Sequence, residues 1–266
     1  MEKNTVNNIN QIIKELGSID LAKIEIKELE KMISFLMNGY NTRLMKVPAK
    51  LVYRARKKET KRFENIEKLI YPKPEFIKTY GRVNYPFNSV FYGSANESTA
   101  IIENQPKEGD EFTVLLSGLN KDYLTMMELG MRHTAWKSKG KISDDIAIRR
   151  KLGNEQNILK NQLIDDFLID QFTQPVKQGE EDKYKLTAVI GSNFLKGEKI
   201  EGLVFPSIAA DKNTSNIVIK PEVYDNFYVP KECWTILIEK KIERNKYQVL
   251  CTAKAKRIEL NGDIIW

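Results

Sequence analysis

Apolar residues recur at helical spacing along the first 45 residues of the chain. One stripe includes Ile9 and Leu16 and stops at a Gly-Ser pair, and a second includes Leu29 and Leu36 and stops at an Asn-Gly pair. Side chains spaced in this way lie on one face of a helix, and Gly and Asn are common where helices end. The pattern predicts an N-terminal helical appendage over residues 1–45.

Shorter apolar runs replace this pattern from residue 49 onward. Strands are predicted at residues 50–55, 89–92, 111–117, 202–207, 216–219, 235–239 and 248–253. A short helix that ends at Glu103, with Asn96 or Ser98 as its cap, follows the second of these strands. A helical insert is predicted at about 120–173, and residues 185–193 fit either a helix or a strand. The pattern thus predicts a second, α+β domain over residues 46–266.

Basic residues exceed acidic residues by a small margin. The chain has 43 Lys and Arg residues against 36 Asp and Glu residues, for a formal net charge of +7, and the densest basic run extends from Arg54 to Arg62. An excess of this sign favours polyanionic partners such as nucleic acid, an anionic lipid surface or a phosphorylated small molecule. A basic run by itself is more often a solvated face.

Several kinds of chemistry have no support in the sequence. His133 is the single histidine, and its context favours a structural or surface role over that of a base. No phosphate-binding glycine motif and no metal-ligand spacing occurs, and the Asp pairs at 144–145 and 165–166 are typical of solvated helix faces. We therefore expect chemistry that needs neither a metal nor a histidine.

The sequence also bears on the compartment of the protein. Its N-terminal residues lack an apolar signal segment, and no run approaches the about 20 apolar residues of a membrane span. Cys233 and Cys251 lie in separate strand-like stretches, which favours free core thiols over a disulfide or a zinc site. These features predict a cytoplasmic protein that is not attached to a membrane.

Three segments carry a more specific pattern. Residues 53–56 read Tyr-Arg-Ala-Arg, and residues 81–84 read Gly-Arg-Val-Asn and are followed by Tyr92 and Glu103. The third segment has Pro-Ser at 206–207 and then Asn216. In this order and spacing, over roughly residues 50–225, the segments resemble the RES domain, a family named for an Arg, a Glu and a Ser.

The resemblance implies a fold, a substrate and a partner. The implied fold class is α+β, with an ADP-ribosyltransferase-like split β core and surrounding helices, to which this chain adds its N-terminal helical appendage. The implied substrate is NAD, used without a metal. Members act as toxins of toxin–antitoxin pairs, so a cognate antitoxin protein is the expected partner. They destroy NAD by hydrolysis or phosphorolysis, or they transfer ADP-ribose.

The resemblance also assigns the catalytic residues. Position by position, Arg54 is the motif arginine, Glu103 the motif glutamate and Ser207 the motif serine. Arg56 competes with Arg54 for the first role, because side chains two positions apart in a strand point to the same face. The sequence does not separate the two arginines.

A second group of residues is expected to bind the substrate. These residues are Arg82, Tyr92, Arg56 and Asn216. Val83 departs from the family pattern, which commonly has an aromatic residue at this position, and the departure predicts a reshaped subsite.

These residue types suit cleavage of the nicotinamide–ribose bond. A planar guanidinium, from Arg54 or Arg82, binds a pyrophosphate through paired hydrogen bonds. A carboxylate, from Glu103, stabilises a developing oxocarbenium ion and positions the attacking group. Tyr92 offers an aromatic face to the nicotinamide, and Ser207 offers a hydroxyl to the amide or the ribose. The sequence therefore predicts an NAD glycohydrolase or NAD phosphorylase.

Two other functions are alternatives at this stage. An ADP-ribosyltransferase that modifies a protein target needs the same site. A nucleic-acid-binding or ribonuclease toxin would use the basic run at 54–62, but aromatic side chains that stack on bases are sparse there, which disfavours a nucleic acid partner. The oligomeric state is not determined, and the N-terminal helices are candidates for a homo-oligomer contact.

Overall fold

The computed structural model describes residues 5–41, 44–58, 60–129, 153–177, 179–207 and 214–266, and within these residues nine strands form one mixed sheet. The strands are β1 (Leu44–Val47), β2 (Leu51–Lys57), β3 (Phe91–Ser94), β4 (Glu111–Leu119), β5 (Leu124–Glu128), β6 (Gly202–Pro206), β7 (Ser215–Ile219), β8 (Tyr228–Glu243) and β9 (Lys246–Lys254). A separate C-terminal hairpin consists of β10 (Arg257–Ile258) and β11 (Ile264–Ile265).

The strand order across the sheet is β1-β5-β6-β7-β3-β2-β4-β8-β9. Strands β5 and β6 are parallel, and the other neighbouring pairs are antiparallel. Pairing is interrupted in the middle of the sheet: β2 pairs with β4 from Leu51 to Lys57, but it pairs with β3 at Tyr53 and Ser94 alone. Beyond that point the two halves of the sheet separate.

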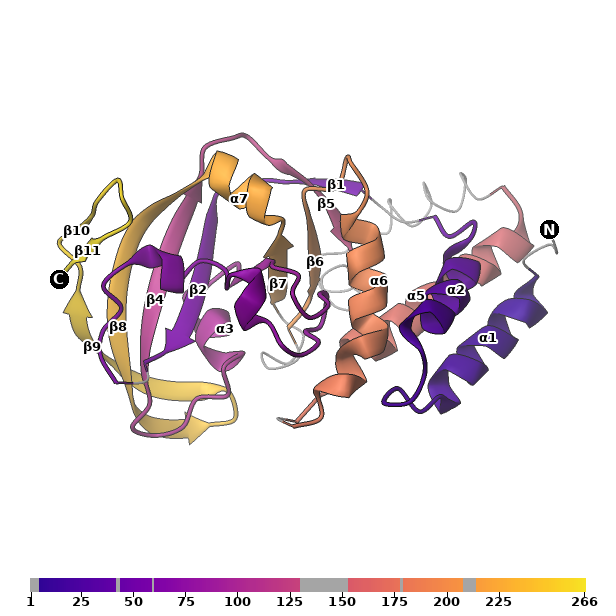
Figure 1. Ribbon diagram of the computed structural model, residues 1–266, viewed down its shortest axis with the longest axis horizontal. Helices are drawn as coiled ribbons and strands as arrows, with labels where there is room; N and C mark the ends of the chain where they lie inside the picture. The colour runs from indigo at the N-terminus through magenta and orange to yellow at the C-terminus, as the bar shows by residue number, and fades with distance from the viewer. Residues whose placement is uncertain (1–4, 42–43, 59, 130–152, 178, 208–213) are drawn as a thin grey trace.

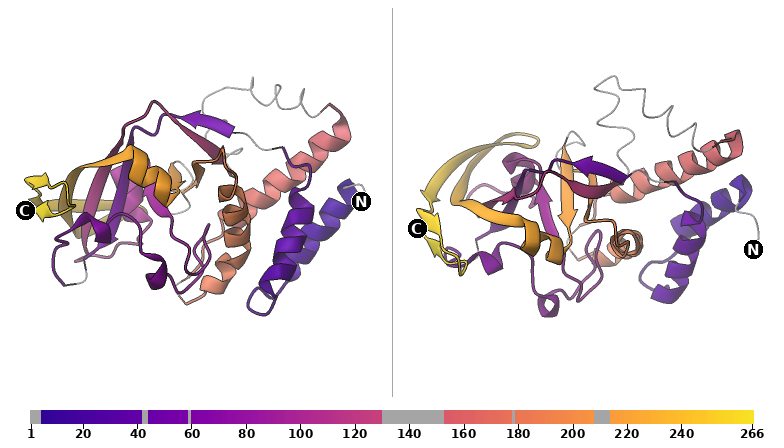
Figure 2. Two further views of the ribbon diagram at one scale, coloured as in Figure 1. Left: turned by 45° about the horizontal axis from the view of Figure 1, so that its top comes forward. Right: turned by 90° about the horizontal axis from the view of Figure 1, so that it is seen from above.

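Helices flank the sheet and extend the molecule at one end. They are α1 (Val6–Ser18), α2 (Ile26–Met37), α3 (Glu97–Ile102), α5 (Glu155–Phe172), α6 (Lys185–Leu195) and α7 (Pro221–Phe227). In the described parts of the chain, three short 3-10 helices, at Ile66–Lys68, Pro74–Phe76 and Glu181–Tyr184, lie in the connections. Helices α1, α2 and α5 lie together at one end of the molecule, α6 lies between them and the sheet, and the β10–β11 hairpin lies at the opposite end (Figures 1 and 2).

The N-terminal helices bury the two stripes that the sequence predicts. Ile9, Leu16, Leu29 and Leu36 are all buried, and they belong to one apolar cluster that includes Phe172 and residues of α6 and β6. The N-terminal segment therefore packs on the rest of the chain through a continuous core. Its division from the rest of the chain at residue 45 stays a prediction.

Two strands of the large sheet and the two short strands of the C-terminal hairpin were not predicted. The helical insert expected at about 120–173 contains β5, and the segment expected to be helical up to residue 45 ends where β1 begins. The sequence Leu-Thr-Met-Met-Glu of β5 has helix-forming residues, but pairing with β1 on one side and β6 on the other overrides this local preference. Helix α5 supplies helical structure further along the predicted insert. His133 and the Asp pair at 144–145 lie outside the described residues.

The other predicted elements are found close to their expected positions. Residues 185–195 form helix α6, which settles the choice between helix and strand. This helix approaches the segment at 81–84 closely, since a Cβ atom at Gly191 would lie 2.6 Å from the Cβ atom of Val83. The helices and the large mixed sheet confirm the predicted α+β fold class.

The cysteines differ from each other in environment. Cys233 is buried on β8, as predicted, and burial raises the pKa of its thiol to about 12. Cys251 is exposed on β9, so the prediction of a core thiol is wrong there, because β9 is an edge strand of the sheet. None of the helices in the described ranges is long and apolar enough to span a membrane.

The shared core makes a prediction about α2. Leu29→Ala should lower the free energy of unfolding by about 2–5 kcal/mol, because it leaves a cavity at a fully buried position. The matched control is Ser34→Ala, an exposed position of the same helix, for which a change within about 0.5 kcal/mol is expected. Urea unfolding followed by circular dichroism measures both. If Leu29→Ala leaves the midpoint of the main unfolding transition unchanged, α2 does not share the core of the sheet.

Candidate active site

A cavity of about 700 Å³ opens where β2 and β3 separate. Residues from β2, β3, β6, β7, α3, the segment at 81–82 and the 3-10 helix before α6 line it. Within the described residues, the lining has a single carboxylate, that of Glu103. It also has five cationic side chains, those of Arg54, Arg56, Lys57, Lys58 and Arg82. The cavity is therefore electropositive with one negative group.

Arg54 lies where β2 leaves β3. Its Nη1 donates a hydrogen bond of 2.7 Å to the carbonyl of Tyr92 on β3, at a position where β2 and β3 no longer pair. Burial, together with the nearby Arg56 guanidinium, lowers the pKa of Arg54 to about 10, so the side chain is still charged at neutral pH. The Nε atom is buried and has no hydrogen-bond partner among the described residues. This buried donor is therefore unsatisfied within the part of the chain that the structure describes.

Helix α3 brings Glu103 to the cavity. Of the two predicted caps it is Asn96 that precedes the helix, and its side chain accepts a hydrogen bond of 2.9 Å from the backbone N–H of Thr99. Glu103 directly follows the last helical residue, and its own N–H bonds to the Thr99 carbonyl at 3.0 Å. Its side chain is exposed and lines the cavity. A short, capped helix thus fixes the direction of the carboxylate.

Two neutral donors hold this carboxylate. Ser207 Oγ donates to Oε1 of Glu103 at 2.5 Å, and Asn216 Nδ2 donates to the same oxygen at 2.7 Å. Asn216 Oδ1 in turn accepts a hydrogen bond of 3.2 Å from Ser94 Oγ. The donors come from neighbouring strands, because Ser207 follows β6, Asn216 lies near the start of β7 and Ser94 ends β3. Since neither donor is charged, the negative charge of Glu103 is oriented without being cancelled.

Arg82 contacts the end of α5. Its Nη1 donates to the Phe172 carbonyl at 3.0 Å and its Nη2 donates to the Gln174 carbonyl at 3.1 Å, while the guanidinium lies over the Tyr184 ring, 4.9 Å from its centroid. Carbonyls at the C-terminal end of a helix favour a cation. Arg82 therefore lines the cavity and also joins its wall to α5 and to the start of α6.

Tyr92 also has a positioning contact. Its hydroxyl accepts a hydrogen bond of 2.9 Å from the Val83 N–H and donates one of 3.2 Å to Asn84 Oδ1. Burial raises the pKa of Tyr92 above its ordinary value, so the hydroxyl stays protonated. The ring lines the cavity, and the hydroxyl holds the segment that carries Arg82.

The predicted residues Arg54, Glu103, Asn216, Arg82 and Tyr92 thus line one cavity, and the buried Ser207 supports it from behind through its hydrogen bond to Glu103. A model of the RES domain matches residues 51–236, which include all of these positions. The chain belongs to the RES-domain family. A comparison with curated proteins found no match. The RES domain is associated with NAD-related, toxin-like functions.

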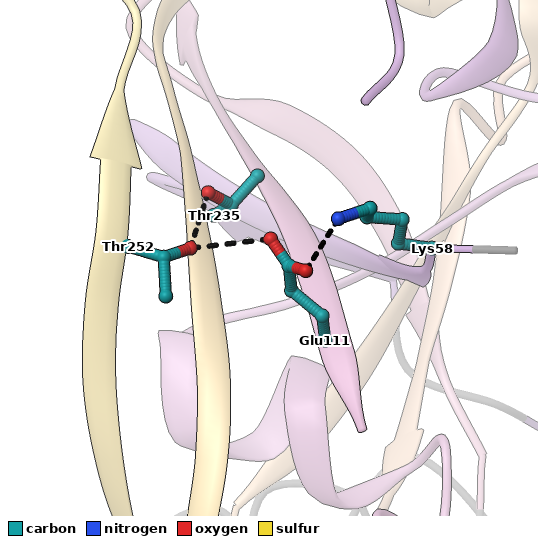
Figure 3. A network of polar contacts seen from close by, with 4 residues as sticks. All are labelled: Lys58, Glu111, Thr235 and Thr252. Atoms are coloured by element: carbon teal, nitrogen blue, oxygen red, sulfur yellow. Dashed lines mark hydrogen bonds and ion pairs between the residues drawn. The ribbon is translucent and has the colours of Figure 1, made fainter. Parts of the chain in front are cut away.

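The basic rim of the RES domain is partly neutralised. Lys58 Nζ pairs with Glu111 Oε2 at 2.5 Å, and the other oxygen of Glu111 accepts a hydrogen bond of 3.2 Å from Thr252, which also bonds to Thr235 (Figure 3). The hydrogen bond from Lys58 lowers the pKa of Glu111. Lys57 similarly pairs with a carboxylate, that of Asp110, at 2.6 Å.

The three arginines of the cavity have different partners. Arg54, Arg56 and Arg82 all donate to backbone carbonyls, and Arg56 does so to the carbonyl of Lys68. Carbonyls fix a guanidinium without removing its net charge. The positive potential of the cavity therefore comes mainly from these arginines. The basic run at 54–62 is therefore not uniformly positive, because its Lys57 and Lys58 are paired with carboxylates.

The two candidates for the motif arginine are both at the cavity but face different surroundings. Arg54 bonds to β3 and lies 5.8 Å from the Phe91 ring centroid, whereas Arg56 lies 5.4 Å from the Phe63 ring centroid. Arg54 also lines a second, smaller cavity of about 180 Å³ next to the first. Its position at the separation of the strands favours Arg54 as the motif arginine.

Sequence reasoning missed several residues of the cavity, among them Ser94, Tyr53 and Tyr184. Ser94 lies two positions after Tyr92 on β3, so strand alternation was a usable signal for it. Tyr53 belongs to the matched tetrapeptide, and its ring packs edge-on against Trp234 at 6.4 Å between centroids. Tyr184 has no local signal, because its place depends on how α6 packs beside Arg82.

Val83 lies beneath the 81–84 segment. It is fully buried against Gly191 and is not among the residues that line the cavity. Any effect of Val83 on the cavity would therefore pass through the packing of the 81–84 segment, and a reshaped subsite stays a prediction. Within the described ranges, no group of three or more His, Cys, Asp or Glu side chains is arranged to hold a metal ion.

The rim network makes a pH-dependent prediction. Because the Lys58 hydrogen bond lowers the pKa of Glu111 below its ordinary value of 4.5, the pair stabilises the fold above that pH. The stabilisation is lost as the pH falls through the lowered pKa. Glu111→Gln should therefore be less stable than the wild type by about 1 kcal/mol at pH 7, and the difference should be smaller at about pH 3.

Urea unfolding at both pH values measures this difference. The control is Glu232→Gln, which removes a more exposed ion pair with Lys254, and a smaller change is expected for it. Equal losses for Glu111→Gln at the two pH values would contradict the assignment.

Proposed function

We propose that this protein is an NAD-consuming toxin that cleaves the nicotinamide–ribose bond, as an NAD glycohydrolase or NAD phosphorylase. The observation that carries the proposal is the single carboxylate of Glu103, held by Ser207 and Asn216 in a cavity with three carbonyl-anchored arginines. Membership of the RES-domain family supports NAD as the substrate.

The charges of the cavity suit the charges of NAD. Its pyrophosphate is anionic and binds guanidinium groups through paired hydrogen bonds. Arg54 is the best placed of the three arginines, because its buried Nε has no partner within the described residues. A ligand phosphate oxygen could satisfy this donor only after the guanidinium turns toward the cavity that Arg54 lines. Arg56 and Arg82 add positive potential and orient the rest of the dinucleotide.

The carboxylate suits the charge that develops during cleavage. As the C1′–N bond of the nicotinamide riboside breaks, the electron pair leaves with neutral nicotinamide and positive charge develops on the ribose. Ser207 and Asn216 both bond to Oε1 of Glu103, so Oε2 is directed to the ligand and stabilises this charge. Water or phosphate then forms the new bond to C1′, and in the case of water its proton is released as the bond forms.

The three tyrosines of the cavity have different roles in the proposal. The hydroxyl of Tyr92 bonds to Val83 and Asn84, so Tyr92 acts in the proposal mainly by holding the cavity wall. Tyr53 and Tyr184 also present ring surface to the cavity and are additional candidates to contact a base.

The toxin role requires a restraint on the activity. We propose a cognate antitoxin protein that closes the cavity, in line with the toxin-like functions associated with the family. Co-expression of this protein with the antitoxin tests the idea. In the complex, nicotinamide release should be abolished and Glu103 should be protected from solvent.

Glu103 gives the first test of the reaction. Glu103→Gln keeps an oxygen that can accept from Ser207 and Asn216 but removes the charge, so nicotinamide release should fall by about 100-fold or more while the fold is retained. The control is Glu97→Gln, the same change on the same helix, where the carboxylate bonds to Trp234 at 2.7 Å and does not line the cavity. Its activity should stay close to that of the wild type.

Nicotinamide release is followed with and without phosphate, and with NAD labelled in the ADP-ribose part. A phosphate requirement identifies phosphorolysis, and label retained on a protein identifies ADP-ribosyl transfer. Full activity in Glu103→Gln, or no consumption of NAD by the wild type under any of these conditions, would overturn the proposal.

Matched substitutions separate the two arginines of the tetrapeptide. Arg54→Lys keeps the charge but loses the planar fork of donors, and it should raise the KM for NAD by about tenfold, which corresponds to about 1.4 kcal/mol of binding. Arg56→Lys should have a smaller effect, because Arg56 bonds to the Lys68 carbonyl away from β3. Steady-state kinetics over a range of NAD concentrations measures both, and a larger effect at Arg56 would reverse the assignment.

A further inference from the structure

Helix α2 contacts the segment that forms one wall of the cavity. Tyr85 directly follows the 81–84 segment, and its hydroxyl donates a hydrogen bond of 3.0 Å to Oε1 of Glu30 on α2. Both side chains are partly buried, and Tyr85 packs against the core that contains α1 and α2. The Tyr85 ring also meets the Tyr80 ring edge-on at 6.3 Å, and Tyr80 lines the smaller cavity. A side chain of the N-terminal segment is thus bonded to the cavity wall.

The 81–84 segment is compact, so a shift at one end of it is expected to shift the other end. The N–H of Gly81 bonds to the carbonyl of Asn84 at 3.0 Å, and a Cβ atom at Gly81 would lie 2.3 Å from Asn84 Oδ1. Ser192 of α6 donates to the carbonyl of Val83 at 3.2 Å. Because these contacts leave little free volume, a displacement of Tyr85 is expected to move Arg82 as well.

A second contact reaches the neighbourhood of Arg82. Lys185 is buried at the first position of α6, and its Nζ donates a hydrogen bond of 2.5 Å to the carbonyl of Ile24 in the α1–α2 connection. The preceding residue, Tyr184, lines the cavity and carries the Arg82 guanidinium over its ring. The N-terminal segment therefore contacts two parts of the chain that adjoin Arg82, the 81–85 segment and the residue after Tyr184.

We propose that Glu30 is a positioning residue for the cavity: through Tyr85 it fixes the 81–84 segment, so that the N-terminal helices determine how well the ligand is held. The kinetic part of this proposal rests on the proposed NAD cleavage. Since Glu30 touches neither the cavity nor Glu103, its loss should weaken substrate binding and leave the chemical step unchanged.

Two substitutions at Glu30 separate positioning from general stability. Glu30→Ala removes the acceptor for Tyr85 and should raise the KM for NAD about fivefold with little change in kcat. Glu30→Gln retains an acceptor oxygen and should restore the wild-type KM. Tyr85→Phe removes the donor and should reproduce the effect of Glu30→Ala.

A matched control is available in the same segment. Tyr40 donates to Asp165 on α5 at 2.5 Å, which is another tyrosine–carboxylate bond of the N-terminal segment, but one that does not involve the 81–84 segment. Tyr40→Phe should lower thermal stability about as much as Tyr85→Phe and should leave the KM unchanged. Equal KM values for Tyr85→Phe and the wild type, or equal KM increases in both Tyr→Phe variants, would overturn the proposal.

Amide hydrogen exchange tests the positioning without reference to NAD. In Glu30→Ala and Tyr85→Phe, exchange in a peptide covering residues 81–92 should be about fivefold faster than in the wild type, whereas Tyr40→Phe and Glu30→Gln should match the wild type. If the wild type fails to consume NAD but this exchange pattern is found, the proposed function fails and the positioning role stands. Unchanged exchange in all four variants would refute the role itself.

Discussion

The separation of β2 from β3 is the constraint on which the rest of the site depends. The two strands pair at Tyr53 and Ser94 and then diverge, which leaves the Tyr92 carbonyl to be bonded by the Arg54 guanidinium in place of a neighbouring backbone. A side-chain donor at this position preserves a hydrogen bond for the carbonyl and keeps the sheet open. The cavity, its positive charge and the exposure of Glu103 all follow from that opening.

The site consists of groups at the ends of neighbouring elements. Ser94, Asn216 and Ser207 lie at the same end of β3, β7 and β6, and α3 aims Glu103 at them. Antiparallel register places the three polar side chains in a row, so that neutral donors orient the carboxylate. Around it, arginines anchored by carbonyls supply positive potential, while two lysines of the rim are paired with carboxylates. Opposite charges thus lie at separate places in one cavity.

The helices at the other end of the molecule form part of the same structure. Helices α1 and α2 share a core with α5 and α6, and residues at the end of α5 and just before α6 supply the carbonyls and the ring that hold Arg82. A segment that looks like an appendage in the sequence is therefore in contact with the wall of the site. This connection gives α2 a means to influence the cavity from outside it.

Local patterns in the sequence determined much of this protein. Alternation and helical stripes predicted most strands and the N-terminal helices, and the ordered motifs from Arg54 to Asn216 indicated the RES family, because each signal is carried by residues close together in the chain. The tertiary structure alone decided that residues 124–128 form a strand, since pairing with β1 and β6 outweighs helical preference. It also decided which groups surround Arg54 and Arg82. Those contacts join residues up to about a hundred positions apart, and no local spacing encodes them.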